Sequence, residues 1–512
     1  MYKSFGYDGE NNRFRIARHQ IGDFGLHLSL IRSFSLGDNF PVESPFFPGK
    51  PLPYHYYFDL LTGFLERAGL RIDIAFNGLS ILFFTALLYL IYKLPQIIFL
   101  KNRLLGILSV LLFIFESNLT FIDFFKEKGI SFSVFKDLWY MPDYIHKGPF
   151  DGSIISIFFT MNVYLNQRHL IAAFVISLAI FYSLIPKLLN REDISVKRLI
   201  LLGFFLGILS RFHSLTFFAT ALSLLFLFIL FKRIRLILPL FLTAGFIFIF
   251  HLKTVLGQDS HSFFNPGFLS SKPLSIFNLL SFWFFNLGLA FILIPFGFIV
   301  SRKPQKLILL SVLPLFLIGN IFQLSYRIDH NHSLFNFFLI FANFYIAYFL
   351  IKILEIKNLL GKFIFTILLF FLTVSGVIDL MAVKNDFQFY FPDAPSNKFM
   401  QWIRVNTKKD DIFLSKQEIL DPVTLSGRKN YMGHDYYLSV MGYNYSERLG
   451  RVKSYFEAKS LKAIDEMKSS GISYLVVPLG KVTDFNYKID TAFLNKTLKV
   501  VYKDKDVAVY KL

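Results

Sequence analysis

The stretch from Asp23 to Asp59 concentrates side chains that can carry out chemistry. It holds four carboxylates, two histidines, one arginine and one lysine, directly ahead of a long series of apolar segments. Asp23 and His27 are four residues apart, so they share one face if this part of the chain is helical. A carboxylate there can act as a general base that deprotonates an acceptor hydroxyl. Asp23 is therefore the candidate catalytic residue, and His27 is a candidate substrate-binding residue.

The rest of this stretch is expected to be irregular. Gly37 and Asp38 should end the helix, and five prolines between Pro41 and Pro53 nearly exclude regular secondary structure. The aromatic run that follows, Tyr54 to Phe58, suits either a membrane interface or stacking on a sugar face, and the sequence does not separate these two uses. Further candidates for substrate binding in this stretch are Lys50, His55 and Asp59.

Two cationic groups lie beside later apolar segments. Arg168 and His169 stand at the mouth of one segment, where a fixed guanidinium can bind phosphate bidentately, although both residues also fit a role as interfacial anchors. Arg211 and His213 interrupt what would otherwise be one apolar run, and ionisable residues at such a break indicate a functional site. All four are candidate substrate-binding residues.

A metal site is not predicted. Asp329, His330 and His332 imitate metal-ligand spacing, but nothing in the sequence fixes three ligands in one geometry. No cofactor is assigned, and a divalent cation is left open.

The elements that must position these residues are membrane helices. The chain has 512 residues, of which 54% are hydrophobic and 17% charged, and its mean hydropathy is +0.50. Apolar runs of about 18 to 22 residues are long enough to cross a bilayer as helices. The sequence thus predicts a polytopic α-helical membrane protein with about ten spans, near 74–92, 104–121, 170–187, 199–210, 213–230, 235–252, 277–299, 307–325, 333–351 and 362–382.

The net charge of +19 is assigned to topology rather than to nucleic-acid binding. Much of the lysine and arginine lies in five short loops that fall on one side if the spans alternate, and this side should be the cytoplasm. Residues 1–73, the loop 122–169 and the tail from 384 then face outward. An outward N-terminus without a preceding span leaves two interpretations: a first transmembrane helix is missing before Met1, or the following helix carries the first loop across.

Three regions follow from this topology: a first extracytoplasmic loop region over 1–73, a helical bundle over 74–383 and a small extracytoplasmic α/β domain over 384–512. In the last of these, the sequence predicts a helix over 397–406, short strands over 411–414 and 472–477, and mostly helix over 435–459. Two alternating runs around residues 503–506 predict a terminal β-hairpin.

The first loop resembles a known family. An outward Asp, a helix, Gly37-Asp38, a proline-rich passage, Gly49-Lys50-Pro51-Leu52 and an aromatic run into the next helix are similar to the first extracytoplasmic loop of GT-C superfamily glycosyltransferases. These enzymes include protein O-mannosyltransferases and the bacterial transferase that adds aminoarabinose to lipid A; the tail looks like those of uncharacterised bacterial members. The chain departs from them in lacking a helix before the Asp and in having His27 where many relatives have a second acidic residue.

The resemblance implies transfer of a sugar from a polyprenyl-phosphate-linked donor to a lipid, glycan or protein acceptor, at the outer face of a bacterial inner (plasma) membrane. The family's first-loop aspartate would map onto Asp23. Cations such as Arg168, Arg211 or Lys50 would stand near the lipid-phosphate leaving group. The alternatives are a transporter or flippase of a lipid-linked saccharide and a catalytically inactive membrane scaffold.

Overall fold

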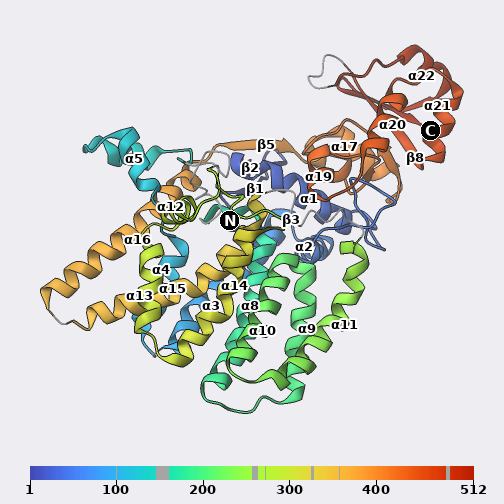
Figure 1. The fold of residues 1–512 in the computed structure, drawn as a ribbon. Coiled ribbons are helices and arrows are strands. Elements are labelled where there is room, and N and C mark those ends of the chain that lie inside the picture. The colour runs from blue at the N-terminus through green and yellow to red at the C-terminus, as the bar shows by residue number, and fades with distance from the viewer. Residues whose placement is uncertain are drawn as a thin grey trace. The chain divides into compact units, whose positions relative to one another are not determined.

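The computed structural model describes residues 1–99, 101–145, 161–256, 263–270, 272–324, 328–356, 358–479 and 485–512 (Figure 1). Contacts divide the chain into two compact units. The first comprises Met1–Leu79, Lys253–Ser260 and Gln388–Leu512, and the second comprises Ser80–Leu252 and His261–Phe387. The first unit therefore contains both the region around Asp23 and the C-terminal residues.

The second unit is built from helices, with one short pair of strands. Its helices, together with α3, which begins in the first unit, are α3 (Ile72–Ile98), α4 (Arg103–Ile114), α5 (Thr120–Lys128), α6 (Ser133–Tyr140), α7 (Met161–Asn166), α8 (Arg168–Leu189), α9 (Val196–Phe212), α10 (Ser214–Leu230), η3 (Ile234–Leu236), α11 (Ile237–Leu256), α12 (Ile276–Leu287), α13 (Leu289–Val300), α14 (Lys303–Ile321), η4 (Ile328–Asn331), α15 (His332–Leu354) and α16 (Leu359–Asn385). The strands β3 (Phe263–Phe264) and β4 (Phe322–Gln323) pair antiparallel.

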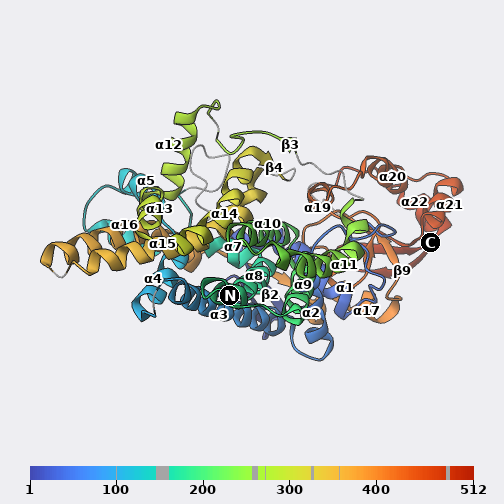
Figure 2. The ribbon, with the colours of Figure 1, turned by 60° about the horizontal axis from the view of Figure 1, so that its bottom comes forward.

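Each of the ten segments that the sequence indicated contains helix, and the chain is an integral membrane protein. In the described part of the chain, five helices are long and apolar enough to cross a membrane, and six if α12 and α13 form one broken span. The five are α3, α8, α14, α15 and α16. The mostly buried α15 packs against α4, α13 and α14, so it forms the centre of this unit (Figure 2).

Two expected spans are interrupted. The segment 277–299 bends by 94° between α12 and α13 at Gly288, which has a φ of +53° and lies against Asn118. A side chain at that position would be strained, because a positive φ strongly favours glycine. The segment 104–121 stops at Ile114, and Asn118 then accepts a hydrogen bond from the backbone N–H of Thr120, in the first turn of α5.

The first unit contains a three-stranded antiparallel sheet that joins the N-terminal residues to the start of the C-terminal part. Its strands, in spatial order, are β1 (Phe5–Asp8), β2 (Arg13–Ala17) and β5 (Gln388–Pro392), as Figure 1 shows. Ile16 pairs with Phe5 on one side and Phe389 on the other. Strands in the first twenty residues were not predicted, although Phe14 and Ile16 alternate with exposed and half-buried residues in the manner of a half-buried strand.

A second sheet of five strands lies in the C-terminal part, in the order β7-β6-β8-β10-β9. The strands are β6 (Ile412–Leu414), β7 (Lys429–Asn430), β8 (Ile472–Pro478), β9 (Lys499–Lys503) and β10 (Val507–Lys511); the helices are η5 (Ala394–Ser396), α17 (Lys398–Asn406), α18 (Pro422–Leu425), α19 (Asp435–Val440), α20 (Ser446–Phe456), α21 (Leu461–Ser469) and α22 (Thr491–Thr497). The predicted helix over 397–406, both short strands and the terminal hairpin are present.

Two helices of the first unit carry the candidate chemistry. A short η1 (Arg18–Gln20) leads into α1 (Ile21–Ser35), and α2 (Tyr57–Arg67) follows the proline-rich loop. The helix over Asp23 and His27 is as predicted, and it ends ahead of Gly37. A Cβ at Gly37 would lie 2.5 Å from the carbonyl of Ser33 and 2.6 Å from that of Gly427, so this close packing requires glycine.

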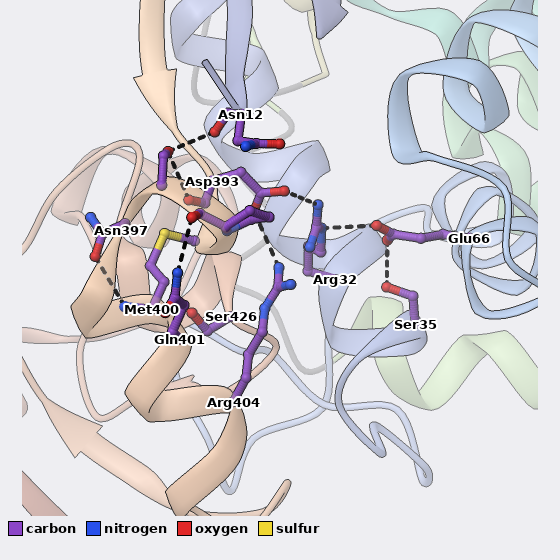
Figure 3. Close-up of polar contacts among 12 residues, drawn as sticks. Asn12, Arg32, Ser35, Glu66, Asp393, Asn397, Met400, Gln401, Arg404 and Ser426 are labelled. Carbon is purple, nitrogen blue, oxygen red and sulfur yellow. Dashed lines mark hydrogen bonds and ion pairs between the residues drawn. The ribbon is translucent and has the colours of Figure 1, made fainter. Parts of the chain in front are cut away.

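A buried arginine holds α1 in place (Figure 3). Arg32 is 4% exposed; its Nε lies 3.1 Å from Oε1 of Glu66 on α2, and one terminal nitrogen donates to Oδ2 of Asp393 at 3.3 Å. Asp393 also accepts from Arg404 of α17 at 3.2 Å. Burial raises the pKa of Glu66, and the Arg32 guanidinium offsets part of that rise. The network ties α1 to α2 and to the start of the C-terminal part.

Substituting Arg32→Met should destabilise the first unit strongly. The change leaves the Glu66 and Asp393 carboxylates buried without this guanidinium, and breaking a buried ion pair in this way costs about 3–5 kcal/mol. The matched control is Arg451→Met, because the ion pair of Arg451 with Glu447 is solvent-exposed on α20 and should contribute under about 1 kcal/mol. Urea unfolding of both variants in detergent measures the difference, and equal midpoints would contradict the role given to Arg32.

Candidate functional site

Asp23 lies in the first turn of α1 and is half-buried. A carboxylate in the first helical turn is stabilised by the positive end of the helix dipole. Burial raises the pKa of two tyrosines, Tyr54 from the proline-rich loop and Tyr437 from α19, and the charge of Asp23 raises it further. Asp23 is thus placed close to two phenol groups that come from distant parts of the sequence.

The face of α1 beside Asp23 packs tightly against the C-terminal part of the first unit. The hydroxyl of Tyr437 donates a hydrogen bond to the carbonyl of Gly22 at 2.6 Å. A Cβ at Gly25 would lie 2.2 Å from the carbonyl of Ile419 and 2.3 Å from the Tyr437 hydroxyl. Glycine at position 25 therefore allows this contact. Tyr437 was not selected from the sequence, because it lies 415 positions from Gly22 along the chain.

His27 and Asp59 form a buried pair one helical turn from Asp23. Nδ1 of His27 lies 3.0 Å from Oδ2 and 3.2 Å from Oδ1 of Asp59, and the two residues are 2% and 1% exposed. Burial raises the pKa of Asp59, while the charge and hydrogen bond of His27 lower it. A carboxylate bound to Nδ1 fixes the orientation of the imidazole, with its other nitrogen, Nε2, on the opposite side of the ring.

Tyr54 and His55 complete the group of sequence-predicted residues in this unit. The ring of Tyr54 lies 6.1 Å from that of His27 and 3.9 Å from that of His55, measured between centroids. The structure therefore gathers Asp23, His27, Asp59 and His55 around Tyr54. Lys50 is different: it is exposed beside Gly49 at a turn of the loop, and no described contact joins it to this group.

The proline-rich loop is held by the C-terminal part of the same unit. The guanidinium of Arg448 lies 3.6 Å from the ring centroid of Phe47 and donates to the carbonyl of Pro48. The hydroxyl of Tyr443 donates to the carbonyl of Pro51 at 2.8 Å. These contacts give an irregular segment a defined path into Tyr54 and α2, and neither Arg448 nor Tyr443 was selected from the sequence.

In the second unit, Arg168 and His169 begin α8 and are both buried. One terminal nitrogen of Arg168 donates to the hydroxyl of Ser80 at 3.3 Å, and its Nε donates to the carbonyl of Leu165 at 3.4 Å. The imidazole of His169 stacks on that of His213, with 5.5 Å between centroids and 16° between planes. A buried guanidinium and two imidazoles therefore lie at the ends of three helices, α8, α9 and α10.

His213 is the break between α9 and α10 that the sequence predicted. Its Nδ1 accepts a hydrogen bond from the backbone N–H of Thr216 at 3.1 Å, which caps α10. Arg211 donates to the carbonyl of Phe250 at 2.6 Å, a contact with α11.

His332 also belongs to this polar region, since Nε2 of its ring lies 3.1 Å from the side-chain nitrogen of Gln167. Asp329, His330 and His332 imitate metal-ligand spacing in the sequence, and the side chain of Asp329 lies outside the described residues. His146, Lys147 and Asp151 of the loop 122–169 also lie outside them.

Each unit can thus perform a different part of group-transfer chemistry. The first holds a half-buried carboxylate beside a His–Asp pair and phenol groups, which suits binding and deprotonation of a hydroxyl. The second holds a buried guanidinium beside two imidazoles, and such groups can donate hydrogen bonds to an anion.

No protein-family model matches this sequence, and no curated protein matches it either. Solved structures do show similarity. One is the oligosaccharyltransferase of Archaeoglobus fulgidus, crystallised with a tethered acceptor peptide, at 10% identity and a TM-score of 0.43 over 90% of this chain and 64% of that one.

The other is ArnT from Cupriavidus metallidurans in the apo state, at 12% identity and a TM-score of 0.48 over 95% of this chain and 92% of that one. This chain spans less than two thirds of the oligosaccharyltransferase. Both of these proteins are GT-C glycosyltransferases.

Proposed function

We propose that this protein is a membrane glycosyltransferase that moves a sugar from a polyprenyl-phosphate-linked donor to an acceptor on the outer face of the membrane. The observation that carries the proposal is the position of Asp23: a half-buried carboxylate one helical turn from the buried His27–Asp59 pair, in a chain with several apolar helices.

In the proposed reaction, Asp23 accepts the proton of the acceptor hydroxyl. The acceptor oxygen attacks the anomeric carbon of the sugar, and the bond from that carbon to the phosphate oxygen breaks. The polyprenyl phosphate leaves with the bonding electrons. A carboxylate can act as the base in this step, because the acceptor hydroxyl becomes more acidic as the new bond forms in the transition state.

His27 is proposed as a substrate-positioning residue. With its Nδ1–H donated to Asp59, the neutral ring presents a lone pair on Nε2, which can accept a hydrogen bond from a sugar or acceptor hydroxyl. His55 and Tyr54 offer aromatic faces and polar edges beside it, which suits a sugar ring. Lys50 remains a proposed contact to a charged group of the substrate.

Arg168 and His169 of the second unit are proposed to bind the donor's phosphate, with His213 supporting His169 through ring stacking. A guanidinium binds phosphate oxygens through paired N–H donors. Arg211, which contacts Phe250, is proposed only as an additional source of positive charge.

Asp23→Asn should abolish most of the transfer activity. Loss of a general base lowers the rate by about 10²- to 10⁴-fold. The assay incubates membranes containing the protein with radiolabelled polyprenyl-phosphate sugars and measures transfer of label. The control is Asp38→Asn, since the Asp38 side chain is 63% exposed and its ion pair with Arg67 is long, at 3.9 Å. Equal transfer by wild type and Asp23→Asn would remove Asp23 from the mechanism.

Asp59→Asn should impair the same step through His27. An asparagine can present its amide nitrogen to Nδ1, which favours the opposite tautomer and removes the lone pair from Nε2. We expect kcat to fall about tenfold or more, with little change in KM. The kcat of the double variant, His27→Gln with Asp59→Asn, should be no lower than that of the more severe single variant. Independent, multiplying effects of the two substitutions would contradict a coupled pair.

Arg168→Gln should raise the KM for the donor by about 10- to 100-fold, because a hydrogen bond from a charged donor contributes about 1.5–3 kcal/mol. Arg198→Gln is the matched control; its Nε donates to the hydroxyl of Ser183, so it too bonds a serine on a neighbouring helix. Inorganic phosphate should inhibit the wild type competitively against the donor and inhibit Arg168→Gln less. Unchanged donor KM in a folded Arg168→Gln protein would contradict the proposal.

A further inference from the structure

The short helix α6 and the residues just before it expose an unusual amount of aromatic and aliphatic surface. Four side chains define an aromatic surface: Ile130, Phe132, Phe135 and Trp139, with exposed fractions of 92%, 94%, 68% and 56%. Soluble parts of proteins rarely leave such side chains clustered in water, and a contiguous apolar patch of this kind marks an interaction site.

The aromatic surface is not the face by which α6 packs on the protein. Val134 and Met141 are buried, and with the partly buried Leu138 they pack against Ile378 and Val374 of α16. These three positions follow the helical spacing of four and three residues, so they form one face of α6. α6 is therefore attached to α16 by its buried face, and its exposed aromatic side chains take no part in that packing.

Helix geometry separates three faces of α6. At 3.6 residues per turn, Phe132, Phe135 and Trp139 form a second ridge, which lies roughly 120° around the helix axis from the buried one. Lys136, Asp137 and Tyr140, all exposed, lie on a third face. One face meets protein, one is aromatic and one is polar, which is the pattern of a helix lying in a membrane interface.

Contacts at the end of α16 place this helix at the level where a bilayer ends. α16 is apolar enough to cross a membrane and most of its surface is exposed. The amide nitrogen of Asn385, its last residue, donates to the carbonyls of Trp139 at 2.8 Å and Met141 at 3.1 Å. The ammonium of Lys384 lies 3.1 Å from the Trp139 ring centroid. Tryptophan and lysine together are typical of membrane–water boundaries.

We propose that the aromatic surface inserts into the interfacial layer of the lipid bilayer, at the Asn385 end of α16, and continues the lipid-facing surface of that helix. The charges of the region favour a lipid rather than a charged protein partner, because they pair locally: Lys126 with Asp123 at 3.5 Å and Lys128 with Glu127 at 2.6 Å. Insertion is therefore driven by apolar area and does not require anionic lipid.

The proposal is tested on the full chain in phosphatidylcholine nanodiscs. The sequence contains no cysteine, so one nitroxide label can be attached at Phe135→Cys or Asp137→Cys without further changes. The label at 135 should collide preferentially with oxygen, which concentrates in lipid, and the label at 137 with a water-soluble nickel complex. Phe132→Cys repeats the measurement at a second position of the aromatic ridge.

Two results would overturn the proposal. Equal access of the nickel complex at 132, 135 and 137 would show that the aromatic surface faces water. Protection of 132 and 135 from both reagents would show that protein covers it, either another chain or a second copy. The measurement needs no transferase activity, so it stands apart from the role proposed for Asp23.

Discussion

The first unit depends on one buried cation. Arg32 holds a guanidinium away from water, and its ion pairs with the carboxylates of Glu66 and Asp393 offset the free-energy cost of that desolvation. Because Arg32 and Asp23 lie on the same helix, fixing one end of α1 also fixes the direction in which the other end presents its carboxylate. Asp393 in turn engages Arg404 and Tyr7, so the same charge orders the N-terminal hairpin and α17.

A buried ion pair is a poor source of stability compared with apolar packing, because desolvation offsets most of the attraction. The ion pair instead restricts the orientation of α1. Apolar contacts such as those of Phe34 and Leu30 would tolerate small rotations of α1, whereas a guanidinium between two carboxylates allows few alternatives. In the His27–Asp59 pair, nearer to Asp23, a carboxylate likewise restricts the orientation of a buried side chain, here the imidazole ring.

Features with a local signal could be predicted from the sequence. The apolar segments, the helix over 397–406 and the terminal hairpin follow from periodicity and turn residues, and the shared face of Asp23 and His27 follows from a spacing of four. The predicted break at His213 was likewise visible as polar residues between apolar runs. Each of these depends on neighbours within a few turns of chain.

What could not be predicted depends on contacts between distant residues. The pairing of β2 with β5, the hydrogen bond from Tyr437 to Gly22 and the joining of His27 to Asp59 are properties of the fold rather than of any short stretch. The bend at Gly288 was missed because an isolated glycine in an apolar run is common in membrane helices. Only the packing against Asn118 and the positive φ identify it.

The meeting of Arg32 with Asp393 sets an order of events during synthesis. The two residues are 361 positions apart, and the five described helices that are long and apolar enough to cross a membrane are all translated between them. At about 5–20 residues per second, the ribosome needs on the order of tens of seconds to bridge that interval. Throughout it, α1 lacks its second carboxylate and β2 lacks β5. The contacts around α1 are therefore completed only after the helical segments have been synthesised, so a partly synthesised chain lacks them.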